Sequence, residues 1–343
     1  MKAILIERFG PPEVLVEREV PSPKPVGDEI KVRVRASGLN FADLLQRLHL
    51  YGNAPGVPYI PGFEVSGEVI ACGPEVTRFQ EGQRAVALTR FGGYAEEVCV
   101  SEQMAEQIPD SMGFESAAAV PVTYLTAWFC LVEMAHIADG ERVLIQGGSG
   151  GVGTAAIQIA QLWDTTIYST AGSSEKLDFL RRAGVANPIN YRTQDFAAEI
   201  RRLTNEEGID VVIDSLGGTA LQEAYNLLRP LGRLVSYGLS SAVSGPGRNW
   251  LKTARAVFQT PKFKPLDMIG RNVGVFGFHL ALLGSRSERA AAAFKKILDF
   301  IDKGRLEPIV GQTFPLSRDG AVAAHHYMHG RRNIGKILLT ADS

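Results

Sequence analysis

The chain has few cysteines, little net charge and no long apolar run. Its 343 residues include three cysteines, Cys72, Cys99 and Cys130, which lie far apart without a Cys-x-x-Cys pair. Counting leaves disulfides open, but reduced thiols are favoured. A net charge of -1 at pH 7 gives no general attraction to nucleic acid, so we expect no nucleic-acid partner. No apolar stretch is long enough to span a bilayer. The first residues mix charge with proline, unlike a signal peptide, and we expect a cytoplasmic protein.

A chain of this length normally forms two domains. The first 120 residues read as mostly β, because residues 30–34 alternate apolar and charged side chains and residues 64–71 form another strand pattern. Recurring glycine and proline separate these short strands, which favours a partly open barrel. Residues 39–48 predict a helix, and a second helical stretch after Phe114 is interrupted at Pro121. We expect the domain boundary near Thr123.

Residues 142–163, RVLIQGGSGGVGTAAIQIAQLW, predict a strand, a glycine turn and a helix. The apolar run 143–145 suits a buried parallel strand. The glycines that follow permit a tight turn and let backbone amides approach a ligand closely. The helix begins within these glycines, so its free N–H groups and positive dipole end face the turn. A pyrophosphate is the natural occupant.

A glycine fingerprint alone is a weak signal, but its surroundings strengthen it. A second strand pattern lies at residues 166–170, a third leads to Asp214, a fourth spans 232–238, and residues 272–278 would close the sheet. Strands and helices that alternate in this way predict an α/β domain with a doubly wound parallel sheet. Such a sheet binds a dinucleotide where its strand order reverses.

Several segments carry a family resemblance that covers nearly the whole chain. They are MKAILIERFGPPEVL, PGFEVSGEV from Pro61, GGYAEEVCV from Gly92, VTYLTAW from Val122 and the GGSGGVG turn. They resemble the medium-chain dehydrogenase/reductases, and among these the zinc-free quinone oxidoreductase, or zeta-crystallin, branch. VFGFHL from Val275 and NIGKILL from Asn333 are similar to the vesicle amine transport protein homologs of that branch.

The resemblance implies a GroES-like partly open β-barrel catalytic domain and a Rossmann domain. It places the catalytic domain at residues 1–123 and 273–343, and the Rossmann domain at 124–272, with a sheet that extends to about residue 280. It also implies a homodimer that pairs through the edge strand at 272–278, since an unpaired apolar edge invites aggregation.

The sequence predicts that no metal is bound. Zinc members of the superfamily carry a histidine ligand where Phe63 stands and a cysteine ligand where Asn40 stands, so only Glu64 remains. A catalytic zinc needs three protein ligands. His325 and His329 are spaced four apart on an expected helix, which superficially resembles a metal pair. Without a third ligand we interpret them as a solvated or capping helix end.

The end of the second strand favours NADPH over NADH. Residues 169–172 contain no acid, and the first one follows at Glu175, whereas an NAD site usually places Asp or Glu there to bind the ribose. The resemblance places Lys176, Tyr191 and Arg331 around the 2′-phosphate, and Ser173 adds a hydroxyl. The alternative for Lys176 is a solvated helix residue. The cofactor-binding residues implied in all are Gly148, Ser149, Gly150, Gly151, Val152, Gly172, Ser173, Lys176, Tyr191, Tyr237, Gly238, Phe276, Gly277, Phe278, Arg331 and Asn333.

Four residues match catalytic positions of the family: Asn40, Asp43, Tyr51 and Thr126. Tyr51 is the expected proton or hydrogen-bond donor to the acceptor. Asn-x-x-Asp before apolar residues would also cap a helix, so function and capping both remain open for Asp43. For Asn40 we favour function, because it replaces a metal ligand.

Residues 240–271 are longer than a connection between strands should be. Within them a basic amphipathic helix is expected, and its apolar face comprises Trp250, Leu251, Ala254, Val257 and Phe258. The basic side chains beside it are Lys252, Arg255, Lys262 and Lys264. We prefer a lid helix that packs its apolar face over the cleft. The alternative is a peripheral contact of residues 250–264 with an anionic membrane.

Two hypotheses for function follow. In the first, the protein is an NADPH-dependent reductase of a small-molecule quinone or a related activated enone or carbonyl compound. In the second, it is an NADPH-binding membrane-associated or interaction protein with vestigial activity. Nucleotide binding needs the same residues in both.

Overall fold

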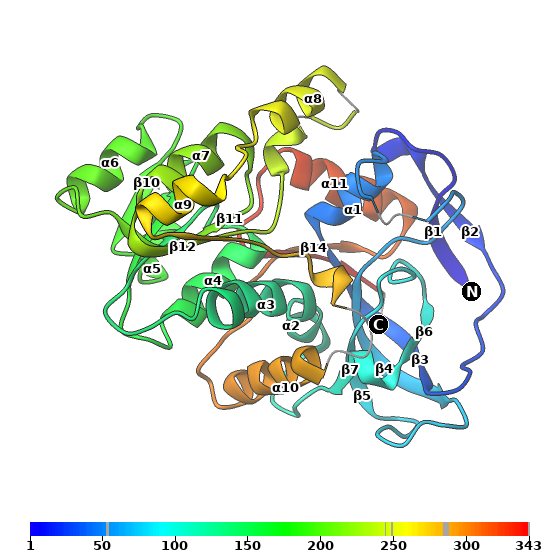
Figure 1. Ribbon diagram of the computed structural model, residues 1–343. Helices are drawn as coiled ribbons and strands as arrows, with labels where there is room; N and C mark the ends of the chain where they lie inside the picture. Colours follow the sequence, from blue (N-terminus) through cyan, green and yellow to red (C-terminus); the bar gives the residue numbers. More distant parts are fainter. Residues whose placement is uncertain (53–54, 244, 248–249, 284–287, 342–343) are drawn as a thin grey trace. The chain divides into compact units, whose positions relative to one another are not determined.

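The computed structural model describes residues 1–52, 55–243, 245–247, 250–283 and 288–341 (Figure 1). The chain divides into two compact units. The first comprises Met1–Leu125, Gly245–Arg248 and Leu280–Ser343, and the second comprises Thr126–Ser244 and Asn249–His279. The expected fold class is confirmed, since one unit holds a mainly antiparallel sheet and the other a parallel sheet.

The first unit is built on a seven-stranded sheet and a separate hairpin. The sheet order is β14-β15-β3-β4-β5-β7, with β6 paired to β3. Its strands are β3 (Glu29–Leu39), β4 (Glu64–Cys72), β5 (Arg84–Leu88), β6 (Glu97–Ser101), β7 (Ala105–Gln107), β14 (Val310–Pro315) and β15 (Lys336–Thr340). The hairpin consists of β1 (Lys2–Ile6) and β2 (Leu15–Glu19). The alternation of apolar and charged residues at 30–34 reflects a strand with one buried face, because Ile30, Val32 and Val34 are buried between more accessible charged residues.

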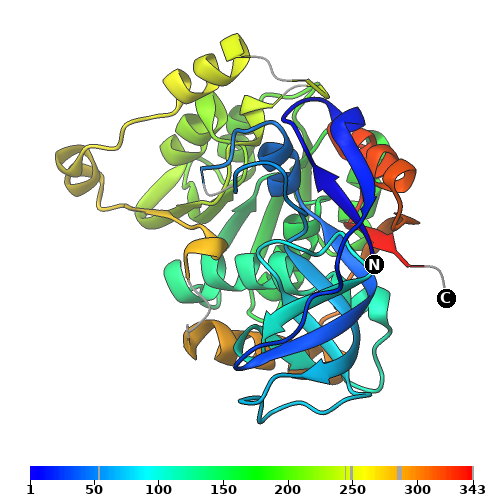
Figure 2. The ribbon, with the colours of Figure 1, turned by 90° about the vertical axis from the view of Figure 1, so that its right-hand side faces the viewer.

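The first unit also contains helices, two of which pack against this sheet. The helices are α1 (Phe41–Arg47), α2 (Phe114–Ala118), α10 (Glu288–Asp302) and α11 (Arg318–His329), with short 3-10 turns at Pro12–Val14, Glu102–Met104 and Leu280–Leu282. Helix α11, near the red end of the colour scale, packs against the blue hairpin, as Figure 2 shows. Strand β15 pairs antiparallel with β3, with Ile337 opposite Leu39. This register brings Lys336, at the start of β15, beside Asn40, which follows β3.

The second unit is a six-stranded parallel sheet in the order β10-β9-β8-β11-β12-β13. Its strands are β8 (Arg142–Ile145), β9 (Thr166–Ala171), β10 (Asn187–Asn190), β11 (Ile209–Asp214), β12 (Leu228–Ser236) and β13 (Gly274–Gly277). Every residue of β11 is buried, as a central parallel strand requires. The strand order reverses between β8 and β11, which is the position where such sheets bind ligands.

Helices connect these strands. They are α4 (Gly151–Ala160), α5 (Ser174–Arg182), α6 (Phe196–Leu203), α7 (Gly218–Asn226), α8 (Trp250–Gln259) and α9 (Pro265–Arg271), with a 3-10 turn at Ser240–Ala242. Helix α3 (Pro121–Trp128) runs from the first unit into the second and begins at the predicted break. It continues as a π-helix at Phe129–Met134. Across the described part of the chain, every helix is too short or too polar to cross a membrane.

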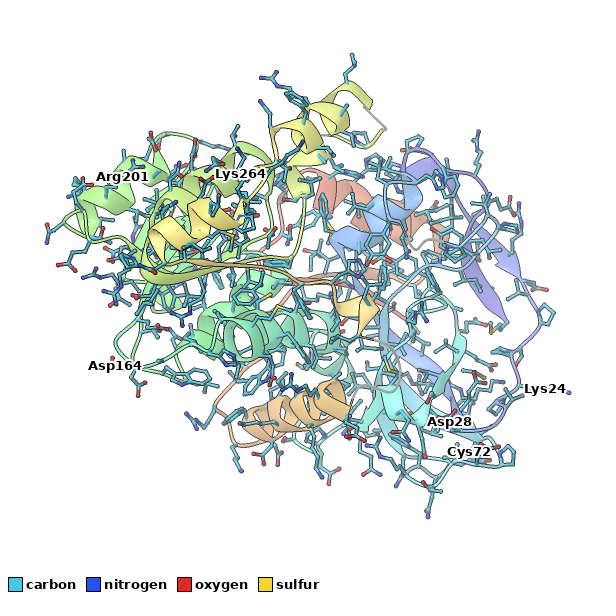
Figure 3. The ribbon with its side chains drawn as sticks, viewed as in Figure 1. Lys24, Asp28, Cys72, Asp164, Arg201 and Lys264 are labelled. Atoms are coloured by element: carbon cyan, nitrogen blue, oxygen red, sulfur yellow. The ribbon has the colours of Figure 1, made fainter. Side chains whose placement is uncertain are left out.

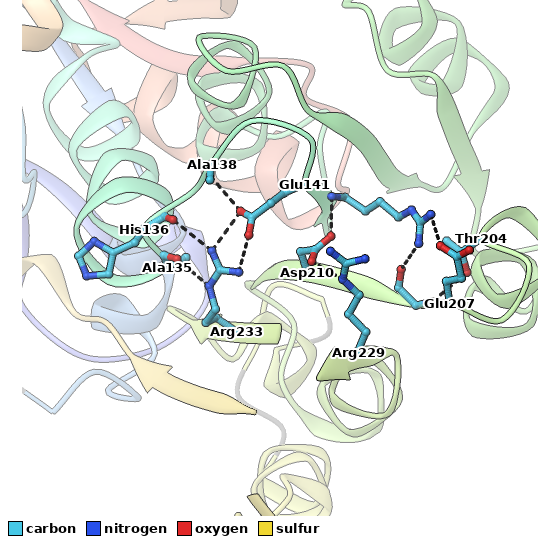
Figure 4. Close-up of polar contacts among 11 residues, drawn as sticks. Ala135, His136, Ala138, Glu141, Thr204, Glu207, Asp210, Arg229 and Arg233 are labelled. Atoms are coloured by element: carbon cyan, nitrogen blue, oxygen red, sulfur yellow. Dashed lines mark hydrogen bonds and ion pairs between the residues drawn. The ribbon is translucent and has the colours of Figure 1, made fainter. Parts of the chain in front are cut away.

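Ion pairs and backbone contacts hold the amino ends of the central strands together (Figure 4). Arg233 donates to the carbonyl of Ala135 at 2.7 Å and to Glu141 at 2.6 Å, which fastens β12 to the chain before β8. Asp210 accepts from the backbone N–H of Arg142 at 2.9 Å and pairs with Arg229. These contacts lie opposite the carboxyl ends of the strands, where the glycine turn is found.

Candidate functional site

The glycine turn after β8 leaves no room for side chains at its closest points. Gly147 has a φ of +71°, which favours glycine. A β-carbon at Gly148 would collide with the Ser169 hydroxyl, and one at Gly153 would collide with the Gly147 carbonyl. Gly150 is the N-cap of α4 and so provides no side chain to cap that helix. The turn therefore fits the pyrophosphate of a dinucleotide, which would approach the backbone and the helix N-terminus directly.

The end of β9 is polar but uncharged. The Ser169 hydroxyl donates to the Ile145 carbonyl at 2.8 Å, and the Thr170 hydroxyl accepts from the Gly147 N–H at 3.2 Å. These two side chains thus fix the position of the turn. Ser173 follows as the N-cap of α5, where its hydroxyl oxygen accepts from the Lys176 N–H at 3.4 Å.

Arg192 is a polar residue at this strand end that the sequence reading missed. A β-carbon at Gly172 would lie 2.6 Å from the Tyr191 hydroxyl and 3.1 Å from Arg192 Nε. Tyr191 is 44% exposed and Arg192 is exposed as well, so both present polar groups to solvent beside Gly172. Arg192 could have been predicted from its position in the sequence, because it follows β10, which is the neighbour of β9 in the sheet. Lys176 lies half-buried on α5 in the same unit.

The predicted residues on the nicotinamide side follow β12 or lie at the end of β13, except Thr126, which lies buried on α3. Phe278 is buried and stacks on Phe129, with ring centroids 5.3 Å apart. A β-carbon at Gly238 would lie 2.9 Å from the Ser215 carbonyl oxygen, so this position also admits close approach of the backbone. Phe276, on the edge strand, is 39% exposed.

Asp214 ends β11 and is buried beside the turn Leu216–Gly217. It accepts from the N–H of Gly217 at 2.9 Å and of Leu216 at 3.2 Å. Burial raises the pKa of this carboxyl to about 6, and the two N–H donors oppose that rise. Its role in the fold is to hold the turn that leads into α7.

In the first unit, three polar side chains form a buried cluster. Asn40 is 8% exposed, Glu64 0% and Lys336 3%. Lys336 Nζ lies 2.5 Å from Glu64 Oε1 and 2.5 Å from Asn40 Oδ1. Asn40 Nδ2 donates to Glu64 Oε1 at 2.7 Å and to the Gly38 carbonyl at 3.3 Å. Both hydrogens of the Asn40 amide therefore bond to groups of the protein. The contacts with Glu64 and Lys336 fix the orientation of this amide.

Asp43 caps α1 and is also the buried acid nearest this cluster. Its carboxylate accepts from the Asn40 N–H at 2.8 Å and from the Gly62 N–H at 3.2 Å. Burial raises the pKa of Asp43 to about 7, against the lowering effects of the Asn40 N–H and of Lys336. The capping alternative thus has direct geometric support, while a catalytic role for Asp43 stays a prediction.

Tyr51 packs edge-on against Phe63, with ring centroids 5.8 Å apart. It is partly exposed. Burial, followed by the charge of Asp43, raises the pKa of Tyr51 to about 12, so the phenol keeps its proton at neutral pH. The hydroxyl can therefore donate a hydrogen bond.

The expectation that His325 is solvated or caps a helix end is wrong. His325 is fully buried because α11 packs against α1, and its Nδ1 accepts from Arg47 Nε at 3.2 Å. His329 Nε2 lies 2.6 Å from the same guanidinium. Burial, then the Arg47 charge, lowers the pKa of His329 to about 4 and that of His325 well below its ordinary value. The pattern of the sequence gave no indication that a buried arginine would face these rings.

The chemistry of the donor set does not fit a metal. Within the described ranges, no three or more His, Cys, Asp or Glu side chains group so that they could hold a metal ion. Phe63 offers no lone pair, and the Glu64 carboxylate faces the Lys336 ammonium. Arg331 and Asn333 belong to the first unit, where Asn333 Nδ2 donates to the Gly335 carbonyl at 3.2 Å. Their contact with a cofactor stays a prediction.

Helix α8 exists as expected, but the prediction that its apolar face packs over a cleft is wrong. Leu251 is 85% exposed and Phe258 is 90% exposed. The buried residue of this helix is Ala256, and the Thr253 hydroxyl donates to the Ala242 carbonyl at 3.1 Å. Ala256 thus packs inward, whereas the apolar side chains of Leu251, Val257 and Phe258 face solvent. The side chains of Trp250 and Lys252 lie outside the described residues.

The comparisons with known proteins agree with this architecture. Residues 27–110 match the alcohol dehydrogenase GroES-like domain, and residues 151–299 match the zinc-binding dehydrogenase family. The synaptic vesicle membrane protein VAT-1 homolog of Danio rerio is 38% identical over 330 residues, which cover 95% of this chain and 67% of that protein. The chain is a medium-chain dehydrogenase/reductase. It lies near the VAT-1 subgroup, since the Homo sapiens VAT-1 homolog is also 36% identical over 95% of this chain and 82% of its own length.

Solved structures give the same result. The human VAT-1 homolog-like protein superposes with a TM-score of 0.86 at 30% identity and covers 100% of this chain and 98% of its own. A mycobacterial protein solved with NADPH has a TM-score of 0.85 at 27% identity, with 99% and 100% of the two chains covered. A mycobacterial quinone oxidoreductase has a TM-score of 0.82 at 27% identity and covers 99% of each chain. The chain thus has the fold of a nicotinamide-dependent oxidoreductase.

Proposed function

We propose that the chain is a zinc-independent, NADPH-dependent reductase that transfers hydride to a quinone or a related activated enone or carbonyl compound. The similarity to the mycobacterial quinone oxidoreductase and to the protein solved with NADPH supports this class. The Gly147–Gly153 turn supports dinucleotide binding independently, because its shape requires glycine. We infer a cytoplasmic location from the free thiols of Cys72, Cys99 and Cys130.

The observation that carries the choice of NADPH is the strand end around Gly172. No carboxylate is present at residues 169–172, and Tyr191 and Arg192 converge on Gly172. Bound NADPH would supply the hydride. The chain would hold its 2′-phosphate with Arg192, Tyr191 and Lys176, and its pyrophosphate with the first N–H groups of α4. A charge-assisted hydrogen bond contributes roughly 1.5–3 kcal/mol, or about one to two decades of affinity.

Nucleotide titration followed by fluorescence tests this choice. We expect NADPH to bind at least tenfold more tightly than NADH. Arg192→Ala should weaken NADPH binding by about tenfold or more and leave NADH binding unchanged. Arg182→Ala, at an exposed arginine on α5, is the matched control and should change neither. Equal affinity of the unaltered protein for both nucleotides would refute the proposal.

On the acceptor side, the chain would work without a Lewis acid. Tyr51 keeps its proton and would donate a hydrogen bond to the acceptor oxygen, while Phe63 excludes water from that face. We expect NADPH oxidation with some of a panel of ortho- and para-quinones and enones, and no stoichiometric zinc in the purified protein by elemental analysis. Absence of turnover with every acceptor, together with tight NADPH binding, would favour the second candidate function.

That second function is NADPH binding by a membrane-associated protein, and the surface of α8 and α9 favours it. Leu251, Phe258, Leu266 and Ile269 are each more than two-thirds exposed. Residues 250–271 contain five basic residues and one acidic residue. One of these basic residues, Lys264, directly precedes α9 and is exposed (Figure 3). Exposed apolar side chains among basic ones suit the headgroup region of an anionic bilayer.

Sedimentation with liposomes separates the two functions. If the membrane contact is real, the protein should cosediment with phosphatidylserine vesicles more than with phosphatidylcholine vesicles. Leu251→Glu plus Phe258→Glu should abolish this, whereas Val26→Glu, at a position 65% exposed in the first unit, should not. Equal sedimentation of the double variant and the unaltered protein would exclude a contact through α8.

A further inference from the structure

The buried Lys336 ammonium contacts Asn40, which stands at a position where the zinc members of this superfamily carry a metal ligand. Residues 40 and 63 are ligand positions in those relatives, and here they are asparagine and phenylalanine. Lys336 Nζ is 2.5 Å from Asn40 Oδ1 and 2.5 Å from Glu64 Oε1. A buried ammonium at this distance neutralises the Glu64 carboxylate, as a metal cation would.

The backbone has adapted to this arrangement. A β-carbon at Gly38 would collide with Glu64 Oε1, so glycine is required for the carboxylate to lie beside β3. Glu64 Oε2 accepts from the Val122 N–H at 2.7 Å, which fixes the second oxygen. The β3–β15 register places Lys336 next to Asn40 although 296 residues separate them in sequence. All five residues belong to the first unit.

The ammonium also sets the orientation of the Asn40 amide. Its oxygen faces the positive charge of Lys336, and its nitrogen faces the negative charge of Glu64. A divalent cation placed among these oxygens would meet a like charge at contact distance in a site shielded from water. Repulsion is strongest where the surroundings are least polar. The Lys336 charge therefore disfavours metal binding at this cluster, in addition to the effect of the two missing ligands at residues 40 and 63.

We propose that Lys336 serves as the resident cation of this site: it compensates Glu64, orients Asn40 and excludes divalent metal ions. This rests on the proposed zinc-independent function. Lys336 is a positioning residue, since it acts through Asn40 and Glu64.

Restoring the metal ligands with and without Lys336 tests the inference. Asn40→Cys plus Phe63→His, together with the native Glu64, recreates a Cys, His and carboxylate set. Co²⁺ is titrated into this background and followed by the thiolate-to-cobalt absorption band. The background is compared with versions that also carry Lys336→Met, Lys336→Gln or Lys336→Arg. Circular dichroism and thermal unfolding identify any version that does not fold.

The neutral versions, Lys336→Met and Lys336→Gln, should bind Co²⁺ at least tenfold more tightly than the background. Lys336→Arg keeps the charge and should bind as weakly as the background. Because the two neutral side chains differ in polarity, one version can still be measured if the other does not fold. Equal affinity with and without the charge would overturn the role of Lys336. Stoichiometric zinc in the unaltered protein would instead overturn the proposed function, so the two failures are distinguishable.

Discussion

At the residue scale, two buried cations of the described part of the chain have different kinds of partner. Lys336 faces the Glu64 carboxylate, whereas Arg47 faces His325, His329 and the Gly10 carbonyl. The imidazoles must stay neutral to accept from the guanidinium, which explains why the pKa of each is lowered. Neither partner set could be found from sequence, because the contacts of Arg47 with His325 and of Lys336 with Asn40 join residues 278 and 296 positions apart.

The contribution of these histidines to stability should therefore fall in mild acid, whereas the raised pKa values of Asp43 and Asp214 act in the opposite direction. Below about pH 6.5 the unfolded chain protonates its histidines, but folded His329 resists protonation until about pH 4. At these histidines the unfolded state then binds more protons, so they lower the free energy of unfolding as the pH falls from 6.5 to 4. We expect His329 to contribute about 1–2 kcal/mol of this loss.

Urea unfolding between pH 7 and pH 4 measures the effect. His329→Gln removes the titration and keeps an acceptor for Arg47, so its stability relative to that of the unaltered protein should rise as the pH falls from 7 to 4. His136→Asn is the control, because His136 is exposed and has a positive φ that asparagine tolerates. An unchanged pH slope in His329→Gln would show that this ring carries none of the effect.

At the element scale, the turn between β8 and α4 was readable from sequence and the surface of α8 was not. Glycine spacing and a short apolar run depend on local geometry, so the predicted strand, turn and helix are confirmed at 142–160. The direction of an amphipathic face depends on what covers it. For α8 the larger apolar side chains remained exposed because Thr253 and Ala256 face α7 and the turn at Ser240–Ala242.

Gly153→Ala should separate helix propensity from turn geometry. Alanine normally stabilises a helix by about 1 kcal/mol relative to glycine. At Gly153, however, its β-carbon would lie 2.6 Å from Gly148 Cα and overlap the Gly147 carbonyl oxygen. We expect a destabilisation of about 1–3 kcal/mol and weaker NADPH binding.

The matched control is Gly270→Ala within α9, where an added β-carbon would meet nothing within 4 Å. It should be neutral or stabilising and leave NADPH binding unchanged. Thermal unfolding and nucleotide titration of both variants check the prediction. If Gly153→Ala were as stable and bound NADPH as tightly as Gly270→Ala, the turn would not need glycine at that position.

At the scale of the whole molecule, sequence was sufficient for the fold class and the family, because both follow from patterns repeated along the chain. It could not decide which surfaces associate. In the second unit β13 is the last strand of the sheet order, so its outer backbone groups are available for pairing. Phe276 on this strand is 39% exposed.

We predict a homodimer in which two copies of β13 lie side by side and continue the parallel sheet into a second molecule. Light scattering should give twice the 37.2 kDa mass of the chain. Phe276→Glu should shift the mass toward the monomer, because two negative charges would face each other across the pair of edge strands. Phe258→Glu is the control, since Phe258 is exposed on α8 and should affect membrane contact without changing the mass. A monomeric mass for the unaltered protein would contradict pairing through β13, and dissociation by Phe258→Glu alone would move the interface to α8.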